Sequence, residues 1–189
     1  NALYKLCGCL VLIGSLGCSK ILHAEQTPIV EDGQAVGVIV IPEKGSDQIQ
    51  AVAKVLQDYI ERSTGATLPI TTEEGGRSAL HLGETSLVLK NKLQTEEPGR
   101  DGFTQKRIDA KNFAIVGGSD WGAEFGVYDF LERYLGIRWL AATELFTEVP
   151  SHKSLMLPEG SRTDAPVFLS RELFPIEVES DPADVQRAS

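Results

Sequence analysis

Three residues in the second half of the chain have side chains suited to holding a sugar: Arg138, Trp139 and Glu144. An indole ring can stack on the face of a sugar, and a guanidinium group can pair with a carboxylate through two parallel hydrogen bonds. The competing interpretation is that Trp139 fills the core and Arg138 lies at its rim, because large aromatic side chains are usually well buried. Arg171, further along the chain, is a fourth candidate for the edge of a substrate site.

A glycine-rich junction at residues 116–122 raises the question of nucleotide binding. The dinucleotide fingerprint needs glycine at its first, third and sixth positions. Gly117 and Gly122 fill the outer two, but Ser119 occupies the middle position and no P-loop lysine follows. We therefore expect a tight strand-to-helix turn and no nucleotide cofactor. A free-standing nucleotide-binding domain stays a third possibility, and it predicts calorimetric binding of NAD or ATP.

Metal-dependent and hydrolytic chemistry have little support in the sequence. His23, His81 and His152 are far apart, and the chain has no H-E-x-x-H or G-x-S-x-G motif. His81, in the middle of an expected strand, is predicted to be a packed or hydrogen-bonded side chain. Glycoside hydrolysis needs two carboxylates across one cleft, and the sequence offers no pair that can be placed in one. We expect no metal and no catalytic residue in this chain.

The N-terminal residues have the pattern of an export signal. Lys5 precedes an apolar run at residues 6–16, which is shorter than the about 20 residues that a membrane-spanning helix needs. We expect residues 1–24 to be a signal peptide, with Cys18 as an alternative lipoprotein anchor. The protein is thus expected to be secreted or periplasmic, or an outer-membrane lipoprotein if it is anchored at Cys18. All three cysteines lie in this leader, so we expect no disulfide in the mature chain.

Composition and charge narrow the class of protein. The 189 residues are 42% hydrophobic and 24% charged, as in an ordinary globular domain. The net charge of −9 argues against nucleic acid as a partner, because an acidic surface repels phosphate. The chain starts at Asn1 and has no terminating element at Ser189, so we expect it to be a fragment of a longer protein.

The stretch from Asn112 to Ala141 must position the candidate residues. It predicts a strand, a glycine turn, a helix that ends at Gly136, and a second strand at 137–140. The acidic residues of this helix are expected on its solvated face. The helical spacing predicts one broad buried face, formed by Trp121, Phe125, Val127, Tyr128, Leu131, Tyr134 and Leu135.

The remaining elements predict an α/β fold, a mixed β-sheet flanked by helices. A polar stretch with proline and glycine at residues 25–35 is interpreted as a linker, and a polar, charged stretch after residue 160 as a domain boundary. Strands are expected at 36–41, 68–71, 79–83, and in a hairpin of 102–108 with 112–116; helices are expected at 47–62 and 85–93.

Several sequence blocks together resemble one family of domains. These blocks are STGATLPI at 63–70, HLGET at 81–85, and DGFTQKRIDAKNFAIVGGSDWGAEFGVYDFLERYLGIRWLAATELFTEVP at 101–150. They resemble the N-terminal α/β domain that precedes the barrel in alpha-glucuronidase-like and beta-hexosaminidase-like glycoside hydrolases. The layout looks most like that of a set of uncharacterised bacterial secreted proteins.

The resemblance implies a particular domain organisation. Residues 36–160 would be a non-catalytic accessory domain, and residues 161–189 a linker and the start of a (β/α)8 barrel. In such families the catalytic carboxylates lie on the barrel. The expected partners are therefore the barrel, against which the domain packs, and a carbohydrate that the missing barrel binds. The alternative is a carbohydrate-binding or surface-attachment module without enzymatic activity.

Overall fold

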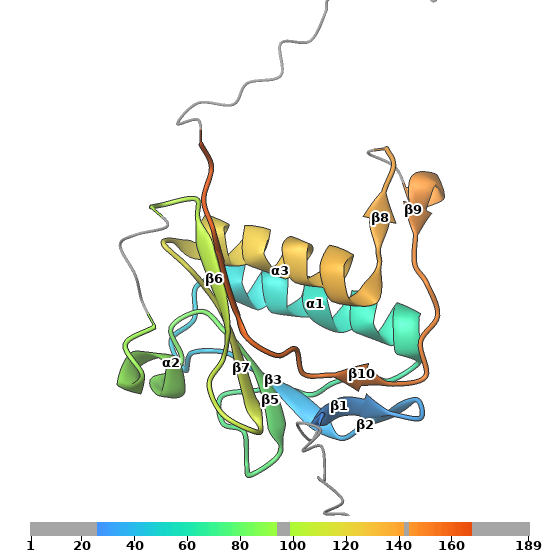
Figure 1. Ribbon diagram of the computed structural model, residues 1–189, viewed down its shortest axis with the longest axis horizontal. Coiled ribbons are helices and arrows are strands. Elements are labelled where there is room, and N and C mark those ends of the chain that lie inside the picture. Colours follow the sequence, from blue (N-terminus) through green and yellow to red (C-terminus); the bar gives the residue numbers. More distant parts are fainter. Residues whose placement is uncertain (1–25, 94–98, 142–143, 168–189) are drawn as a thin grey trace, which may run out of the picture.

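The computed structural model describes residues 26–93, 99–141 and 144–167. They form an α/β fold with a mixed sheet flanked by helices, which confirms the predicted fold class. Figure 1 shows α1 (Asp47–Thr64) and α3 (Asp120–Leu135) side by side on one face of the main sheet. The short helix α2 (Ser86–Lys90) lies on the other face. The expected leader, residues 1–24, lies outside the described residues.

The main sheet has six strands in the described part of the chain. In spatial order they are β11 (Ser161–Asp164), β6 (Phe103–Arg107), β7 (Asn112–Gly117), β5 (Ser78–Leu82), β3 (Gly37–Val40) and β4 (Ile70–Thr71). Strands β4, β3, β5 and β7 are parallel, whereas β6 is antiparallel to β7 and to β11. The predicted hairpin of β6 and β7 is confirmed.

Strand β7 shows how the sheet is covered on both faces. Phe113 and Ile115 belong to the large core cluster with α1 and α3. Ala114 and Val116 point the other way and pack with Val88 of α2. Because successive side chains of a strand alternate between faces, an apolar run such as this one requires cover on both sides.

Helix α1 begins at the predicted Asp47 and ends at Thr64, two residues beyond the predicted end, and its cap is Ser46. The Ser46 hydroxyl oxygen accepts a hydrogen bond from the Ile49 amide at 3.1 Å, which caps the first turn. Gly65 adopts a left-handed conformation at φ 78°, and its amide donates to the Glu61 carbonyl. The face of α1 toward the sheet is formed by Ile49, Val52, Ala53, Leu56 and Ile60.

Helix α3 has the predicted bounds but a different rotation about its axis. Ser119 caps it and Gly136 ends it at φ 72°. Trp121 and Phe125, predicted to be buried, are 50% and 40% exposed. The cause is that Gly122 turns toward the sheet, where an added Cβ would lie 2.2 Å from the Gly102 carbonyl oxygen. This close approach is possible for glycine, so the large side chains of the first two turns point outward.

The described part of the stretch interpreted as a linker, residues 26–35, contains two strands. Strands β1 (Pro28–Glu31) and β2 (Gln34–Ala35) pair as a hairpin, and β1 also pairs with β10 (Leu155–Met156). The hairpin loop is Asp32-Gly33, with φ of 48° and 75°. Ile29 is fully buried in the core cluster. The proline and glycine that suggest a linker are thus a strand start and a tight hairpin turn.

The first residues after the expected boundary at residue 160 form a strand of the main sheet. Ser161–Asp164 is β11, which pairs with β6 at the edge of the main sheet. The Thr104 and Thr163 hydroxyls lie 3.0 Å apart across this pair. Edge strands commonly carry polar and charged residues, so a polar composition does not exclude a strand. Residues 168–189, expected to begin the barrel, lie outside the described residues.

Candidate functional site

The candidate site lies on a two-stranded ribbon that follows α3. Strands β8 (Arg138–Trp139) and β9 (Thr147–Glu148) pair antiparallel, with Arg138 opposite Glu148 and Trp139 opposite Thr147. The Leu140 amide donates to the Phe146 carbonyl oxygen at 2.9 Å, which closes the ribbon. Figure 1 shows the ribbon extending away from the main sheet, beyond α3.

Trp139 is packed between the two long helices. Its indole nitrogen Nε1 donates to the Tyr59 hydroxyl oxygen of α1 at 2.9 Å. The rings of Tyr59 and Tyr128 lie against it nearly at right angles, with centroids 5.4 and 5.2 Å away. Burial raises the pKa of the Tyr128 phenol, and the nearby Glu124 adds to the effect. The arrangement gives Trp139 a packing role; sugar stacking by this ring stays a prediction.

Arg138 lies beside Trp139 but faces solvent. Its Nη1 donates to Glu132 Oε1 at 2.8 Å, and half of the Arg138 side chain is exposed. Asp129, Glu132, Arg133 and Arg138 line an open hollow of about 320 Å³, which we call the arginine hollow. Its two arginines and two acids give it mixed charge, so a ligand carboxylate would compete with acids already in place.

Asp129 is the most connected residue of the arginine hollow. It accepts a hydrogen bond from Arg133 at 3.3 Å, and this bond raises the pKa of Arg133. Gln105 Nε2 donates to Asp129 at 3.0 Å and to the Gly126 carbonyl at 2.9 Å. Arg162 Nε lies 3.4 Å from Asp129 as an ion pair without hydrogen-bond geometry. Asp129 therefore ties α3 to β6 and β11, and it is not simply part of a solvated helix face.

For the other two candidates, Glu144 and Arg171, the structure describes only the backbone of Glu144. Glu144 begins the 3-10 helix η1 (Glu144–Phe146), in the loop that closes the β8–β9 ribbon, so it belongs to the same projection as Arg138 and Trp139. Its side chain is not among those described. Arg171 lies outside the described residues. The structure thus places Arg138 and Trp139 on β8 and the backbone of Glu144 in the loop that connects β8 to β9.

A second hollow was missed by sequence reasoning. Its volume is about 260 Å³, and we call it the exit hollow because the described chain leaves beside it. It joins the loop before β6, the outer face of α3 and the end of β11, which are distant in sequence. The residues that line it are Asp101, Phe103, Phe125, Asp164, Ala165 and Pro166.

The exit hollow contains two carboxylates, but neither is in the setting of a catalytic acid. The Asp101 side chain is 39% exposed and lies 3.8 Å from Arg100. The Asp164 side chain is 49% exposed and is ion-paired with Arg162. A glycosidase acid is usually kept protonated by burial in apolar surroundings, which these positions lack.

The glycine junction between β7 and α3 is a tight turn, as predicted. A Cβ on Gly117 would lie 2.0 Å from the Ala123 amide nitrogen, and one on Gly118 would lie 1.9 Å from the Gly99 carbonyl oxygen. Only glycine allows the backbone to pack this closely at these two positions, which explains both residues without a ligand.

His81 is a packed, hydrogen-bonded side chain, as predicted. Its Nε2 lies 3.0 Å from Asn112 Oδ1, and its Nδ1 lies 3.0 Å from the Thr85 hydroxyl. The Asn112 amide donates to Asp109, which turns its oxygen toward the ring. His81 therefore donates from Nε2 and accepts at Nδ1, and burial lowers its pKa.

Within residues 26–93, 99–141 and 144–167, no three His, Cys, Asp or Glu side chains are grouped so that they can hold a metal ion. No helix in these ranges is long and apolar enough to cross a membrane.

Comparison with known proteins finds similarity in structure alone. No family model and no curated protein sequence matches the chain. A family GH115 4-O-methyl-alpha-glucuronidase, with specificity for decorated arabinogalactans, matches with a TM-score of 0.59 at 15% identity, over 72% of this chain and 18% of its own. The GH20 beta-N-acetylhexosaminidase from Streptomyces coelicolor A3(2) matches with a TM-score of 0.51 at 16% identity, over 76% of this chain and 24% of its own.

The chain therefore has the fold of a domain that also occurs in these two glycoside hydrolases. It spans about a fifth to a quarter of their length. At this level of identity the likeness concerns the fold, and residue roles do not follow from it.

Proposed function

We propose that this chain is the non-catalytic, N-terminal accessory domain of a secreted glycoside-hydrolase-like protein that takes part in polysaccharide breakdown. The observation that carries the proposal is the pattern of coverage: most of this chain matches a small part of two much longer glycoside hydrolases. In this proposal the domain packs against a following (β/α)8 barrel, and the barrel supplies the two catalytic carboxylates.

The described residues support an accessory role. Both hollows are open, and their acids are exposed or tied to arginines. Two of the three residues that suggest sugar binding already have partners within the protein. The Trp139 indole donates to Tyr59, and Arg138 pairs with Glu132. These contacts favour a structural role for the β8–β9 ribbon at the edge of a neighbouring domain.

Export is the second part of the proposal. The first strand begins at Pro28, beyond the expected cleavage site after residue 24, so removal of the leader would leave every described strand intact. Mass spectrometry of the exported protein tests this: a mature chain beginning at Glu25, or a lipid on Cys18, supports export. Retention of residues 1–24 in the cell contradicts it.

The accessory role is tested by the complete gene. We expect the sequence beyond Ser189 to encode a barrel with two facing acids, and the complete product to hydrolyse a polysaccharide or oligosaccharide. A complete gene without such a barrel would refute the proposal.

The alternative, a carbohydrate-binding module without attached chemistry, is favoured by the exposure of Arg133 and Arg138 at the arginine hollow. It predicts that this chain binds a glycan array, with acidic sugars foremost. Loss of that binding in Arg138→Ala and Trp139→Ala, with retention in a distant variant such as Lys90→Ala, would support it. Absence of binding by the wild-type chain would exclude it.

A further inference from the structure

The outward face of α3 carries an aromatic stripe. Trp121, Phe125 and Tyr128 follow one another at helical spacing on this face. The β8–β9 ribbon covers the stripe at Tyr128, whose ring contacts that of Trp139. Trp121 and Phe125 lie beyond the ribbon and are 50% and 40% exposed. We call these two residues the aromatic ledge.

The described chain leaves the domain next to the aromatic ledge. Phe125 lines the exit hollow together with Ala165 and Pro166, so these parts lie close to one another. Val167, the next residue, is 90% exposed. The sequence continues with Phe168 and Leu169, so apolar residues follow immediately at this point.

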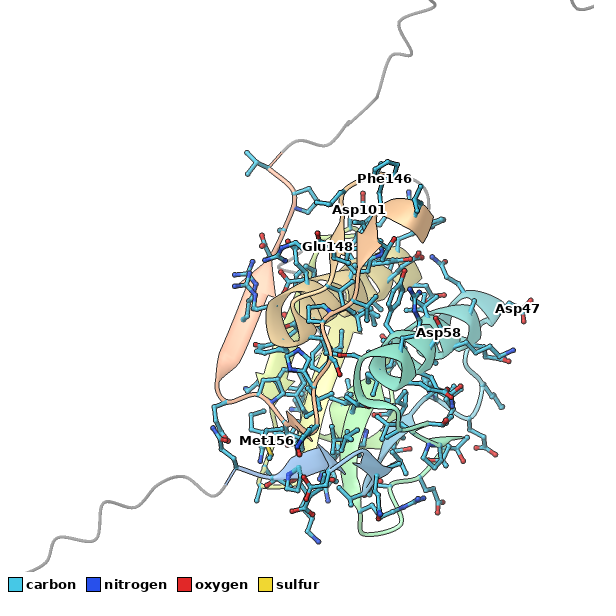
Figure 2. All side chains as sticks on the ribbon, turned by 90° about the vertical axis from the view of Figure 1, so that its right-hand side faces the viewer. Asp47, Asp58, Asp101, Phe146, Glu148 and Met156 are labelled. Carbon is cyan, nitrogen blue, oxygen red and sulfur yellow. The ribbon has the colours of Figure 1, made fainter. Side chains whose placement is uncertain are left out.

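Further exposed apolar side chains lie toward the same end of the molecule. Leu145 is 86% and Phe146 50% exposed in η1, at the tip of the ribbon. Figure 1 shows the ribbon and the end of the described chain both in the upper part of the view, at opposite ends of α3, and Figure 2 shows Phe146 and Asp101 both toward the top. Exposed apolar side chains from several elements gathered on one side are typical of an interaction surface.

We infer that the aromatic ledge is the docking surface for the part of the protein that follows Val167. The inference rests on the proposed function, which requires a further domain in the same chain. A domain tethered at Val167 has a high effective concentration at the ledge, so it outcompetes a second copy of this chain for the same surface. Burial of the two rings would supply the apolar area that an interface between domains needs.

The test is hydroxyl-radical footprinting of the complete gene product, read out by mass spectrometry. The oxidation rate of each residue is compared with its own rate in the denatured chain. Phe130, fully buried, calibrates full protection, and Leu89, 46% exposed on α2, calibrates exposure. We expect Trp121 and Phe125 to be as protected as Phe130. Rates for the ledge that match the behaviour of Leu89 would overturn the inference.

Two further measurements identify the occupant. Sedimentation under the footprinting conditions must show a monomer, since protection that appears only with dimers overturns the inference in favour of a second copy. In the complete product, Trp121→Ser with Phe125→Ser should speed proteolytic cleavage just after β11, whereas the matched surface variant Leu89→Ser should not. Equal cleavage rates in the two variants would overturn the inference.

Failure of this inference is distinguishable from failure of the proposed function. Hydrolytic activity of the complete product without protection of the ledge overturns the docking surface alone. Protection of the ledge by a following domain that lacks a barrel supports the docking surface and overturns the glycoside-hydrolase proposal.

Discussion

The indole nitrogen of Trp139 donates a hydrogen bond to the hydroxyl oxygen of Tyr59 across 2.9 Å, and this contact joins β8 to α1. Eighty positions separate the two residues in sequence. The contact fixes the β8–β9 ribbon over the two helices, and it is the reason why the most suggestive tryptophan of the sequence is a packing residue in the structure.

This hydrogen bond should contribute measurably to stability. We expect Tyr59→Phe to lower the free energy of unfolding by about 1 kcal/mol, because it removes the acceptor of a half-buried hydrogen bond and keeps the ring. Trp139→Phe removes the donor. Urea unfolding of the two single variants and the double variant should show that the losses are not additive; strictly additive losses would mean that the bond contributes nothing.

Replacing the glycines of α3 by alanine should lower the stability by different amounts at different positions. Replacing glycine by alanine within a helix usually stabilises it by about 1 kcal/mol. Gly122→Ala should instead destabilise by about 3 kcal/mol, because the new Cβ would meet the Gly102 carbonyl oxygen at 2.2 Å. Gly126→Ala should cost less, since its Cβ would lie 2.8 Å from a methyl group of Ile115, a milder overlap than 2.2 Å from a backbone oxygen. Thermal unfolding that ranks the two variants the other way would contradict this packing of α3 on the sheet.

Stability should fall as the pH is lowered through the range where an unfolded histidine titrates, near 6.5. Burial lowers the pKa of His81, so below that pH the unfolded chain takes up a proton that the folded chain resists. The stabilisation from neutral His81 is therefore present above pH 6.5 and is lost below it. Between pH 7 and 5, the unfolding midpoint of His81→Gln should therefore depend less steeply on pH than the midpoint of the wild-type chain. A wild-type slope in His81→Gln would contradict the assignment.

Two acids of the arginine hollow should differ in their contribution to stability. Asp129 is 19% exposed and accepts from Gln105, so Asp129→Asn should cost about 2 kcal/mol. Glu132 is 56% exposed and pairs with Arg138 in solvent, so Glu132→Gln should cost less than about 1 kcal/mol. Chemical unfolding of both variants tests the ranking, and equal losses would mean that the buried link to Gln105 is not stabilising.

Much of the fold could be predicted because strong local signals agree with the tertiary structure. Gly65 and Gly136 end α1 and α3 because glycine readily adopts the left-handed conformation that closes a helix. Strands β6 and β7 form the expected hairpin. The rotation of α3 could not be predicted from hydrophobicity, because the close approach of Gly122 to the sheet outweighs the burial of Trp121 and Phe125.

Strands β1, β2 and β11 are not among the predicted elements, and the reason differs between them. Asp32-Gly33 is a common two-residue hairpin turn, and this signal was available in the sequence. By contrast, β11 is a polar edge strand whose pairing with β6 depends on backbone contacts between distant residues. The contacts of Trp139 with Tyr59 and Tyr128 likewise form only when α1 and α3 pack together, because the three residues are distant in sequence or lie on different elements.

The central claim, that this chain is a non-catalytic domain of a glycoside-hydrolase-like protein, is tested most directly by measuring sugar release. The isolated 189-residue chain and the complete gene product are incubated in parallel with a panel of polysaccharides and aryl glycosides. We predict that the complete product releases sugar and that the isolated chain does not. Turnover by the isolated chain, or a complete product that never hydrolyses a glycoside, would contradict the claim.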